Sequence, residues 1–458
     1  METVRLGGGG AMWGDAYEPA LDLAESGEVD YLGFDMLGEL GMSIMHKLRM
    51  RDPQAGYSTD IIPRFKSLIP IAREKSIKLV TNGGGANSEG AGRAVADLAR
   101  RNGWNGLKVG TVVQPHLIDD LDKITASGWV FENLDTGEQG LDRIRDRIVA
   151  ADPYTGSEGI VEALGQGADV VITGRTSDNA IWLGPLMHEF GWTFDDGHRN
   201  DIATGIMAGH LIECGPLVTG GLSTQWRLVK GDKSNLGYPI ADVTRDGKIR
   251  IRKLPSTGGV VNEFTVKEQL LYEVHDPARY LMPDGVADLT NIQVREVAED
   301  EVEVTGIHGH APTDTLKLMI GYQDGWIGEG MILCPWPDAL ARAEHCVEMI
   351  RGRVARLGIE LDELRFSFVG LNELGGSLVP TPAEEPSEVA LRVAARARTR
   401  EAVGAIIREV THLWIMGPAG MALHTPPTAP RPVISLWPTL VPRDAVYPRI
   451  RTTVEEVR

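Results

Sequence analysis

An arginine and an aspartate follow one short apolar segment of the chain, in the sequence GRTSD at residues 174–178. Residues 168–173 are mostly apolar and are predicted to form a buried strand, so both side chains stand at its carboxyl end. Arg175 can hold a substrate carboxylate or phosphate there through two parallel hydrogen bonds, and Asp178 can orient it or act as a base. The alternative is an ion pair between the two that only braces the loop.

Two glycine-rich segments also follow predicted strands, GGGG at residues 7–10 and TNGGGAN at residues 81–87. Backbone N–H groups in such segments, beside the start of a helix, can receive a carboxylate or a phosphate. On this ground we expect four glycines to contact a substrate, namely Gly8, Gly9, Gly83 and Gly84. The alternative is that these glycines only allow a tight turn from strand to helix.

Polar side chains stand at two of these strand ends. Asn82 lies where the strand predicted at residues 78–80 ends, so its amide can point into a ligand site. Asn87 comes just before a predicted helix, and asparagine favours turns and helix caps. We therefore expect Asn82 to be a site residue and Asn87 to be a cap. Asp35 and Glu39 follow a strand predicted at residues 31–34, and one of these two carboxylates is expected to face the same site as Arg175.

A helix predicted over residues 201–214 carries His210, Glu213 and Cys214. Spacings of three and four residues place the three side chains on one face. A thiolate beside an imidazole can be a nucleophile, with Glu213 orienting His210. No oxyanion donor is identified near them, however, and a single buried cysteine is usually a packing residue. Cys214 is therefore kept as an alternative nucleophile, and His210 and Glu213 as candidate site residues.

The sequence shows no set of residues with the spacing of a metal site. A zinc site needs more Cys or His side chains than residues 210–214 supply, and His308 and His310 on one strand are too few by themselves. We therefore predict no metal-binding residues. Neither a GxGxxG dinucleotide loop nor a P-loop is present, so we expect no NAD or ATP, and the cofactor is left open.

These segments need a scaffold that brings their strands side by side. Over the first 215 residues, short apolar runs alternate with glycine-rich loops and amphipathic helices. That alternation predicts an α/β domain with a mainly parallel, doubly wound sheet covered on both faces. Ligands of such sheets bind at the carboxyl ends of the strands, so we expect the loops at Gly8, Asn82 and Arg175 to line one site.

Beyond residue 215 the pattern of apolar residues, and with it the predicted secondary structure, changes twice. Residues 216–335 contain alternating runs such as KIRIRKL and EVEVTGI with DG and GG turns, which predicts an antiparallel β-rich insertion. Residues 336–458 contain two long helical patterns, each followed by an apolar run, which predicts a smaller C-terminal α+β domain. We therefore predict three segments, 1–215, 216–335 and 336–458.

Composition excludes several classes of partner. The chain has 46 Lys and Arg against 64 Asp and Glu, a net charge of −18, and such a field repels phosphate backbones and anionic lipid. We expect neither nucleic acid nor a membrane as a partner. Three cysteines in 458 residues indicate a reducing compartment, and no leader sequence or membrane-length apolar run occurs. We therefore expect a soluble, cytoplasmic protein.

Several segments taken together resemble the acyclic terpene utilisation (AtuA) family. They are YLGFDMLGE, TNGGGAN, IVEALGQGADVVITGRTSDNAIWLGPLMHEFGW, AGHLIECGPLVTGG and DPARYLMPDGVADLTNIQV, and the likeness runs from Val4 to about Pro442. The family is associated with the breakdown of branched acyclic terpenoid acids as CoA thioesters. The resemblance implies a small-molecule carboxylate or an acyl-CoA as the substrate, with CoA as part of that substrate.

Three departures from the family are visible. Asp35 stands where many members have glutamate, and residues 114–116 read QPH where relatives often carry a glycine and acidic residues. Relatives often continue into a ferredoxin-like C-terminal domain, which a separate small subunit would supply here. A homo-oligomer is also expected.

The leading hypothesis is a catabolic lyase of the hydratase or dehydratase type, acting on a branched hydroxy acid or its acyl-CoA thioester. Asp35 or Asp178 would move a proton next to a carbonyl group, while Arg175 and loop amides hold the developing enolate. Two alternatives stay open. One is acyl transfer or thioester hydrolysis through Cys214, and the other is a non-catalytic subunit of a catabolic complex.

Overall fold

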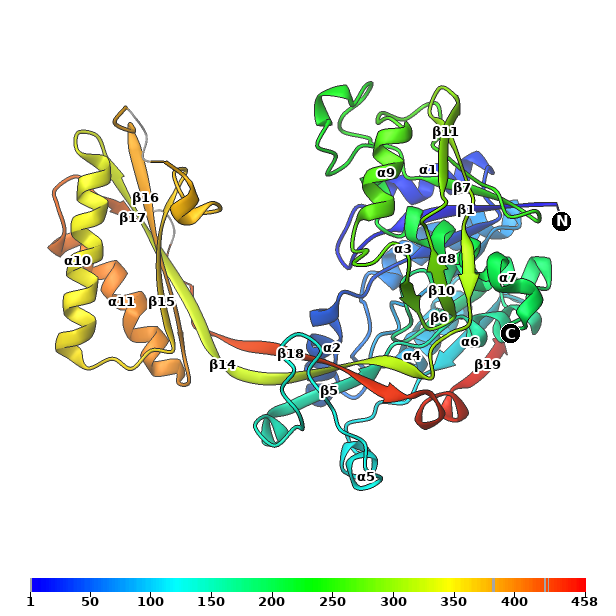
Figure 1. Cartoon of the computed structure of the whole chain (residues 1–458), viewed down its shortest axis with the longest axis horizontal. Coiled ribbons are helices and arrows are strands. Elements are labelled where there is room, and N and C mark those ends of the chain that lie inside the picture. Colours follow the sequence, from blue (N-terminus) through cyan, green and yellow to red (C-terminus); the bar gives the residue numbers. More distant parts are fainter. Residues whose placement is uncertain (1, 381–383, 424–425, 427) are drawn as a thin grey trace. The chain divides into compact units, whose positions relative to one another are not determined.

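The computed structural model describes residues 2–380, 384–423, 426 and 428–458 (Figure 1). The chain divides into two compact units. The first unit holds the chain up to Gly321 together with Leu436–Arg458, and the second unit holds Tyr322–Ser435. No helix in the described ranges combines the length and the apolar character needed to cross a membrane.

Among the described residues, a sheet of ten strands forms the framework of the first unit, in the order β11-β12-β8-β7-β1-β2-β3-β6-β4-β19. Its central strands run parallel to one another. They are β1 (Thr3–Gly10), β2 (Tyr31–Phe34), β3 (Lys78–Thr81), β6 (Val170–Thr173) and β4 (Lys108–Val113). These short, largely apolar runs suit strands that are buried on both faces.

Helices cover both faces of the parallel strands. The chain runs through β1, β2 and β3 in one direction and returns from β4 to β6, and right-handed crossovers then place the helices on opposite faces. One face packs against α1 (Glu18–Ser26), α3 (Ile61–Lys75) and α4 (Ser88–Arg101). The other packs against α6 (Glu158–Gly165), α7 (Ala180–Phe190) and α8 (Arg199–Glu213). Neighbouring strand residues divide accordingly, with Leu79 in one core and Val80 in the other.

The strand order reverses between β3 and β6. The connections after these two neighbouring strands leave toward opposite faces, one into α4 and the other into α7. In open α/β sheets, ligands bind at the carboxyl ends of the strands beside such a reversal. The loops that follow β3 and β6 are those that carry Asn82 and Arg175.

Antiparallel strands extend the sheet on both sides. Beyond β1 come β7 (Ile240–Thr244), β8 (Ile249–Arg252), β12 (Glu301–Thr305) and β11 (Gln293–Ala298), and β19 (Arg451–Glu456) pairs with β4. The chain is thus a mixed α/β protein whose large sheet is partly parallel and partly antiparallel. Strands of the predicted 216–335 segment join the sheet of the N-terminal segment, and the boundaries at residues 215 and 335 stay a prediction.

The first unit has further elements outside the large sheet. A small antiparallel sheet contains β9 (Tyr280–Met282), β10 (Gly285–Asp288) and β13 (His308–His310). The strand β5 (Ile148–Pro153) pairs with β14 (Thr315–Pro335). Three more helices are α2 (Glu39–Arg51), α5 (Leu121–Ala126) and α9 (Glu263–Leu271).

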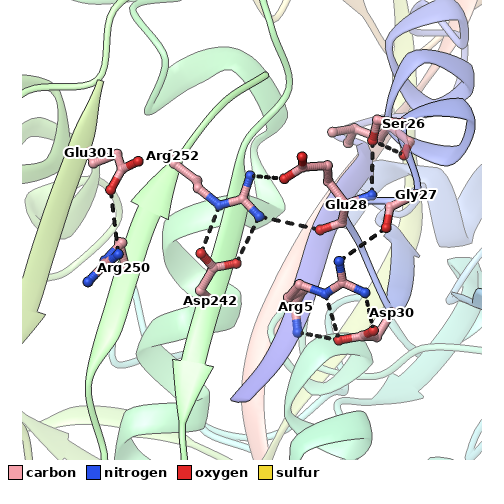
Figure 2. Close-up of polar contacts among 10 residues, drawn as sticks. Arg5, Ser26, Gly27, Glu28, Asp30, Asp242, Arg250, Arg252 and Glu301 are labelled. Carbon is pink, nitrogen blue, oxygen red and sulfur yellow. Dashed lines mark hydrogen bonds and ion pairs between the residues drawn. The ribbon is translucent and has the colours of Figure 1, made fainter. Parts of the chain in front are cut away.

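Ion pairs connect the antiparallel flank to the parallel strands (Figure 2). Arg252 on β8 binds Asp242 on β7 through Nε at 2.7 Å and Nη2 at 3.1 Å, and its Nη1 lies 2.8 Å from Glu28. Arg5 on β1 binds Asp30, which lies just before β2. Arg252 therefore links the antiparallel flank to the segment before β2, and Arg5 links that segment to β1.

The described part of the second unit contains an antiparallel sheet with two helices on it. Along the chain, β14 is followed by α10 (Ala339–Leu357), β15 (Glu363–Val369), β16 (Glu388–Ala397), α11 (Arg400–Met416) and β17 (Ala422–Leu423). In space the strands follow the order β15-β16-β14-β17. This is the β-α-β-β-α-β arrangement of ferredoxin-like folds. The chain enters the unit along β14 and leaves it along β18 (Arg431–Pro442), which also pairs with β14 (Figure 1).

The helix α10 buries one apolar stripe against the sheet of the second unit. Ala339, Ala343, Cys346 and Ile350 are buried, and their spacing of three and four residues marks a single helical face. Cys334 of β14 lies in the same core. These two cysteines therefore pack as small apolar residues.

Candidate active site

Asp35 is the first residue after β2, and two hydrogen bonds hold its carboxyl group. The side-chain Nδ2 of Asn82 donates to Oδ1 at 2.6 Å, and the backbone N–H of Leu37 donates to the same oxygen at 3.2 Å. Asn82 comes directly after β3 and is fully buried, and its Oδ1 accepts the N–H of Met36 at 2.8 Å. Asn82 therefore fixes the turn after β2 and orients Asp35.

The surroundings of Asp35 favour its neutral form. Burial raises the pKa of Asp35 well above its usual value, and the nearby Asp178 raises it further. The charge of Arg175 and the hydrogen bond from Asn82 lower this pKa, but they do not compensate. Asp35 is only 8% exposed, so little water stabilises the carboxylate. Since both donors meet Oδ1, the proton of the neutral acid belongs on Oδ2.

Arg175, the second residue after β6, is buried with 2% of its surface exposed. Its Nη1 donates to the carbonyl oxygen of Leu37 at 2.6 Å, and its Nη2 pairs with Asp178. The guanidinium carbon lies 4.0 Å from the centre of the Tyr154 ring. The ion pair that braces the loop is therefore present. Because Leu37 lies two residues after Asp35, the same contacts bring the ends of β2 and β6 together.

Asp178 is the more accessible partner of this ion pair. Its side chain is 31% exposed, whereas that of Arg175 is 2% exposed. Its charge also raises the pKa values of Asp35 and Glu213, so the three carboxyl groups act on one another electrostatically. Asp178 can thus meet solvent or a ligand while Arg175 supports it from within.

Glu213 and His210 form a buried pair on α8. The His210 ring is fully buried, with Nε2 2.8 Å from the carbonyl oxygen of Gln269 and Nδ1 3.1 Å from Glu213 Oε1. Burial lowers the pKa of His210 to about 4, although the Gln269 carbonyl opposes this shift. Burial also raises the pKa of Glu213 well above its usual value, with Asp178 adding to it. A neutral imidazole that donates to Gln269 and accepts from Glu213 satisfies both groups, so His210 supports Glu213.

Cys214 ends α8 beside the same carboxyl groups. Burial raises the pKa of its thiol, and Glu213, Asp35, Glu273 and Asp178 raise it further. A cysteine nucleophile requires the opposite shift, because the thiolate is the reactive form. The surroundings of Cys214 therefore disfavour a thiolate at neutral pH.

Residues 7–10 do not form the expected loop, since they are the second half of strand β1. The N–H of Gly8 donates to the carbonyl oxygen of Pro239 at 3.0 Å and is not directed at a ligand. A Cβ on Gly8 would lie 2.7 Å from the carbonyl oxygen of Ile212, and one on Gly9 would lie 2.5 Å from the Phe34 ring. These glycines are thus needed for close packing, and a substrate contact at Gly8 or Gly9 stays a prediction.

The glycines after β3 do form a turn. The N–H of Gly83 donates to Thr81 Oγ1 at 3.0 Å, and a Cβ on Gly84 would lie 2.5 Å from the carbonyl oxygen of Thr173 on β6. The turn therefore lets the ends of β3 and β6 approach closely. Asn87 accepts the N–H of Gly90 at 3.0 Å at the start of α4, which confirms it as the predicted helix cap.

The structure brings most of the predicted site residues to one edge of the sheet. Contacts and electrostatic interactions connect Asp35, Asn82, Arg175, Asp178, Glu213 and Cys214. Sequence reasoning missed Tyr154, whose ring contacts two cations. The guanidinium carbon of Arg175 lies 4.0 Å and the ammonium group of Lys317 lies 4.8 Å from the ring centre. Its signal was weak, because Tyr154 follows β5, a strand outside the large sheet.

A surface depression lies at the other edge of the sheet. Its volume is about 300 Å³, and Lys78, Leu107 and Asp169 are among the residues that line it. These residues stand at the amino ends of β3, β4 and β6, so the depression shares no residue with the carboxyl groups around Arg175.

Comparison with known proteins gives one match that spans the chain. The family model described as "Acyclic terpene utilisation family protein AtuA" matches residues 4–452. No curated protein and no solved structure matches the chain.

Proposed function

Since the chain belongs to the acyclic terpene utilisation (AtuA) family, we propose that it is a catabolic hydro-lyase for a branched hydroxy acid or its acyl-CoA thioester. The supporting observation is a pair of unlike carboxyl groups at one sheet edge. Burial favours the neutral form of Asp35, whereas Asp178 is partly exposed and paired with Arg175. Two carboxyl groups in such different surroundings can divide the roles of acid and base.

In the proposed dehydration, Asp178 acts as the base and Asp35 as the acid. The Asp178 carboxylate removes a proton from the carbon next to the substrate carbonyl. The electron pair of that C–H bond first moves into the enolate, with negative charge on the carbonyl oxygen. It then forms the carbon–carbon double bond as the C–O bond to the hydroxyl on the adjacent carbon breaks. Asp35 gives its proton to the departing hydroxyl, which leaves as water. Asp178 then releases its proton to solvent water, and Asp35 takes up a proton from solvent water.

Negative charge that develops on the carbonyl oxygen needs nearby donors. Arg175 supplies a positive charge among these carboxyl groups, and its influence already lowers the pKa values of Asp35 and Glu213. We assign the stabilisation of the enolate to Arg175.

The cysteine-dependent alternative has less support than the hydro-lyase. Acyl transfer or thioester hydrolysis through Cys214 requires a thiolate, but burial raises the pKa of the thiol and the surrounding carboxyl groups raise it further. The leading proposal instead uses Asp35 in the neutral form that its burial favours.

An isotope-exchange experiment distinguishes the role of Asp178 as the base from that of Asp35 as the acid. The full chain is incubated in D₂O with a methyl-branched 3-hydroxyacyl-CoA or the free 3-hydroxy acid, and mass spectrometry follows water loss and deuterium uptake next to the carbonyl. Asp178→Asn should lose both reactions by about 10²- to 10⁴-fold. Asp35→Asn should keep deuterium uptake and lose elimination.

Asp246→Asn provides the matched control. Asp246 is exposed in the turn between β7 and β8, at the edge of the sheet opposite to the carboxyl groups. Its substitution should leave both rates unchanged. Absence of turnover with either substrate class by the wild-type chain would remove the proposal.

A further inference from the structure

Two histidines and an aspartate from separate elements converge in the first unit. His46 lies on α2, His116 follows β4, and Asp152 lies on β5. The Nε2 of His46 is 2.9 Å from Asp152 Oδ2, and the Nδ1 of His116 is 2.7 Å from Asp152 Oδ1. One nitrogen from each ring and one carboxylate oxygen all lie within 4.8 Å of one another.

We propose that His46, His116 and Asp152 bind a divalent transition-metal ion. Two imidazole nitrogens and one carboxylate oxygen are a donor set suited to zinc, iron(II) or cobalt(II). Bonds of about 2.0 to 2.2 Å to one ion place neighbouring ligand atoms roughly 3 to 3.5 Å apart. The side chains therefore need only small shifts to reach such an arrangement.

The surroundings of the three side chains support this site. Asp152 is almost fully buried, and its two carboxylate oxygens each face a ring nitrogen of one histidine. The second ring nitrogen of His116 lies 3.1 Å from the carbonyl oxygen of Ala86. A metal-bound histidine usually donates its other N–H to such a carbonyl, which sets the tautomer and the ring orientation.

A positive charge, that of Arg49, lies beside this group. Its guanidinium donates to the carbonyl oxygen of Ala86 and lies 3.3 Å from Nε2 of His116. That nitrogen is the one remote from Asp152. Arg49 thus contacts the far side of the His116 ring and leaves the Nδ1 side for the ion.

Three protein ligands leave further coordination positions for water or a substrate, as in catalytic metal sites. In the sequence, two of the ligands lie close to residues that contact the loop after β6. Asp152 lies two residues before Tyr154, whose ring contacts Arg175, and His116 lies two residues after Gln114, which accepts the N–H of Gly174. The metal site rests on its own ligands and does not depend on the proposed reaction.

Cobalt(II) is a suitable probe, because its visible absorption reports ligand geometry. The untagged full chain is stripped with a chelator and titrated with Co²⁺, and Zn²⁺ is then added as a competitor. We expect one equivalent of Co²⁺ per chain, with an absorption spectrum that Zn²⁺ removes. His46→Ala, His116→Ala and Asp152→Asn should each weaken binding at least about tenfold.

A double substitution of other histidines controls for nonspecific binding. His308 and His310 alternate on β13, away from these ligands, and H308A/H310A should bind Co²⁺ like the wild type. Circular dichroism checks that each variant is folded, and His116→Ala decides the test if the buried Asp152→Asn variant is not. Equal affinity for Co²⁺ in the wild type and in folded His116→Ala would overturn the proposal. Full binding of one equivalent of Co²⁺ by all three variants would overturn it as well.

Discussion

The side-chain amide of Asn82 donates to Asp35 over 2.6 Å and joins the ends of two neighbouring parallel strands. Asn82 is fully buried, so water cannot replace it as the donor. An amide carries no charge, and it therefore orients the Asp35 carboxyl with a smaller effect on its pKa than a cation would have. The contact keeps Asp35 both fixed in place and able to hold a proton.

Removing this amide should destabilise the first unit. Asn82→Ala leaves the N–H of Met36 without its partner and Asp35 Oδ1 with only the longer bond from Leu37, which we expect to lower the free energy of unfolding by about 2 to 4 kcal/mol. Urea unfolding followed by circular dichroism measures the change. Asn102→Ala is the control, because that amide only bonds the exposed end of α4, and it should cost less than about 1 kcal/mol. Equal losses in the two variants would contradict the buried role of Asn82.

Replacing Asp35 by asparagine should change how stability depends on pH. Burial raises the folded pKa of Asp35 above its unfolded value of about 3.9. The stability linked to this proton is therefore complete below about pH 4 and is lost as the pH rises toward the folded pKa. Asp35→Asn has no proton to lose, so its stability relative to the wild type should rise by up to about 1.4 kcal/mol per pH unit in this window.

Urea unfolding of both proteins between pH 4 and pH 8 measures the effect of Asp35→Asn. The variant should gain stability while losing elimination activity, which is the trade-off expected at an acid held by burial. Wild-type and variant stabilities that run parallel over the whole pH range would show that Asp35 is ionised in the folded chain.

Arg175 should determine the affinity for an anionic ligand. Arg175→Ala removes a charged fork, and we expect the free energy of binding of a branched 3-hydroxyacyl-CoA to weaken by about 2 to 4 kcal/mol. Arg175→Lys should recover only part of this, because an ammonium group cannot reproduce the planar fork. Isothermal titration below the unfolding temperature of each variant measures the affinity.

Arg252→Ala is the matched control for Arg175→Ala. Arg252 also holds an aspartate through two contacts, but it lies on β8 in the antiparallel flank (Figure 2). Its loss should lower stability and leave ligand affinity unchanged. If Arg175→Ala binds the acyl-CoA as tightly as the wild type, the role of Arg175 is only to brace the loop.

Cys214 should react slowly with alkylating reagents at neutral pH. Its pKa is raised by burial and by the surrounding carboxyl groups, so little thiolate is present. Iodoacetamide at pH 7 should label Cys214 more slowly than free cysteine, and the buried Cys334 and Cys346 more slowly still. Peptide mass spectrometry measures the three rates. Labelling of Cys214 faster than free cysteine would favour the cysteine-dependent alternative.

The elements that carry Asn82 and Arg175 could be predicted because their signals are local. Each is a short apolar run that ends in polar or glycine residues, and parallel pairing then brings the two strand ends to one edge. The cap at Asn87 depends only on the residues around the start of α4 and was predicted correctly.

Features that depend on distant neighbours could not be predicted in this way. Glycines disfavour strands, and residues 7–10 continue β1 because β2 pairs with them and because Ile212 and the Phe34 ring pack closely against Gly8 and Gly9. His46 and His116 lie 106 and 36 positions from Asp152, so no local spacing connects the three side chains. The antiparallel flank of the sheet likewise depends on pairing between β7 and β1.

The pairing of β4 with β19 has a consequence for biosynthesis. The second unit lies between these two strands in the sequence, so β4 leaves the ribosome long before β19 is translated. During that interval β4 is an open sheet edge, which is a template for aggregation. The second unit is one continuous stretch of chain and can complete its own sheet earlier. The inserted unit can thus fold before the large sheet closes, and β4 is a sheet edge that stays exposed during that interval.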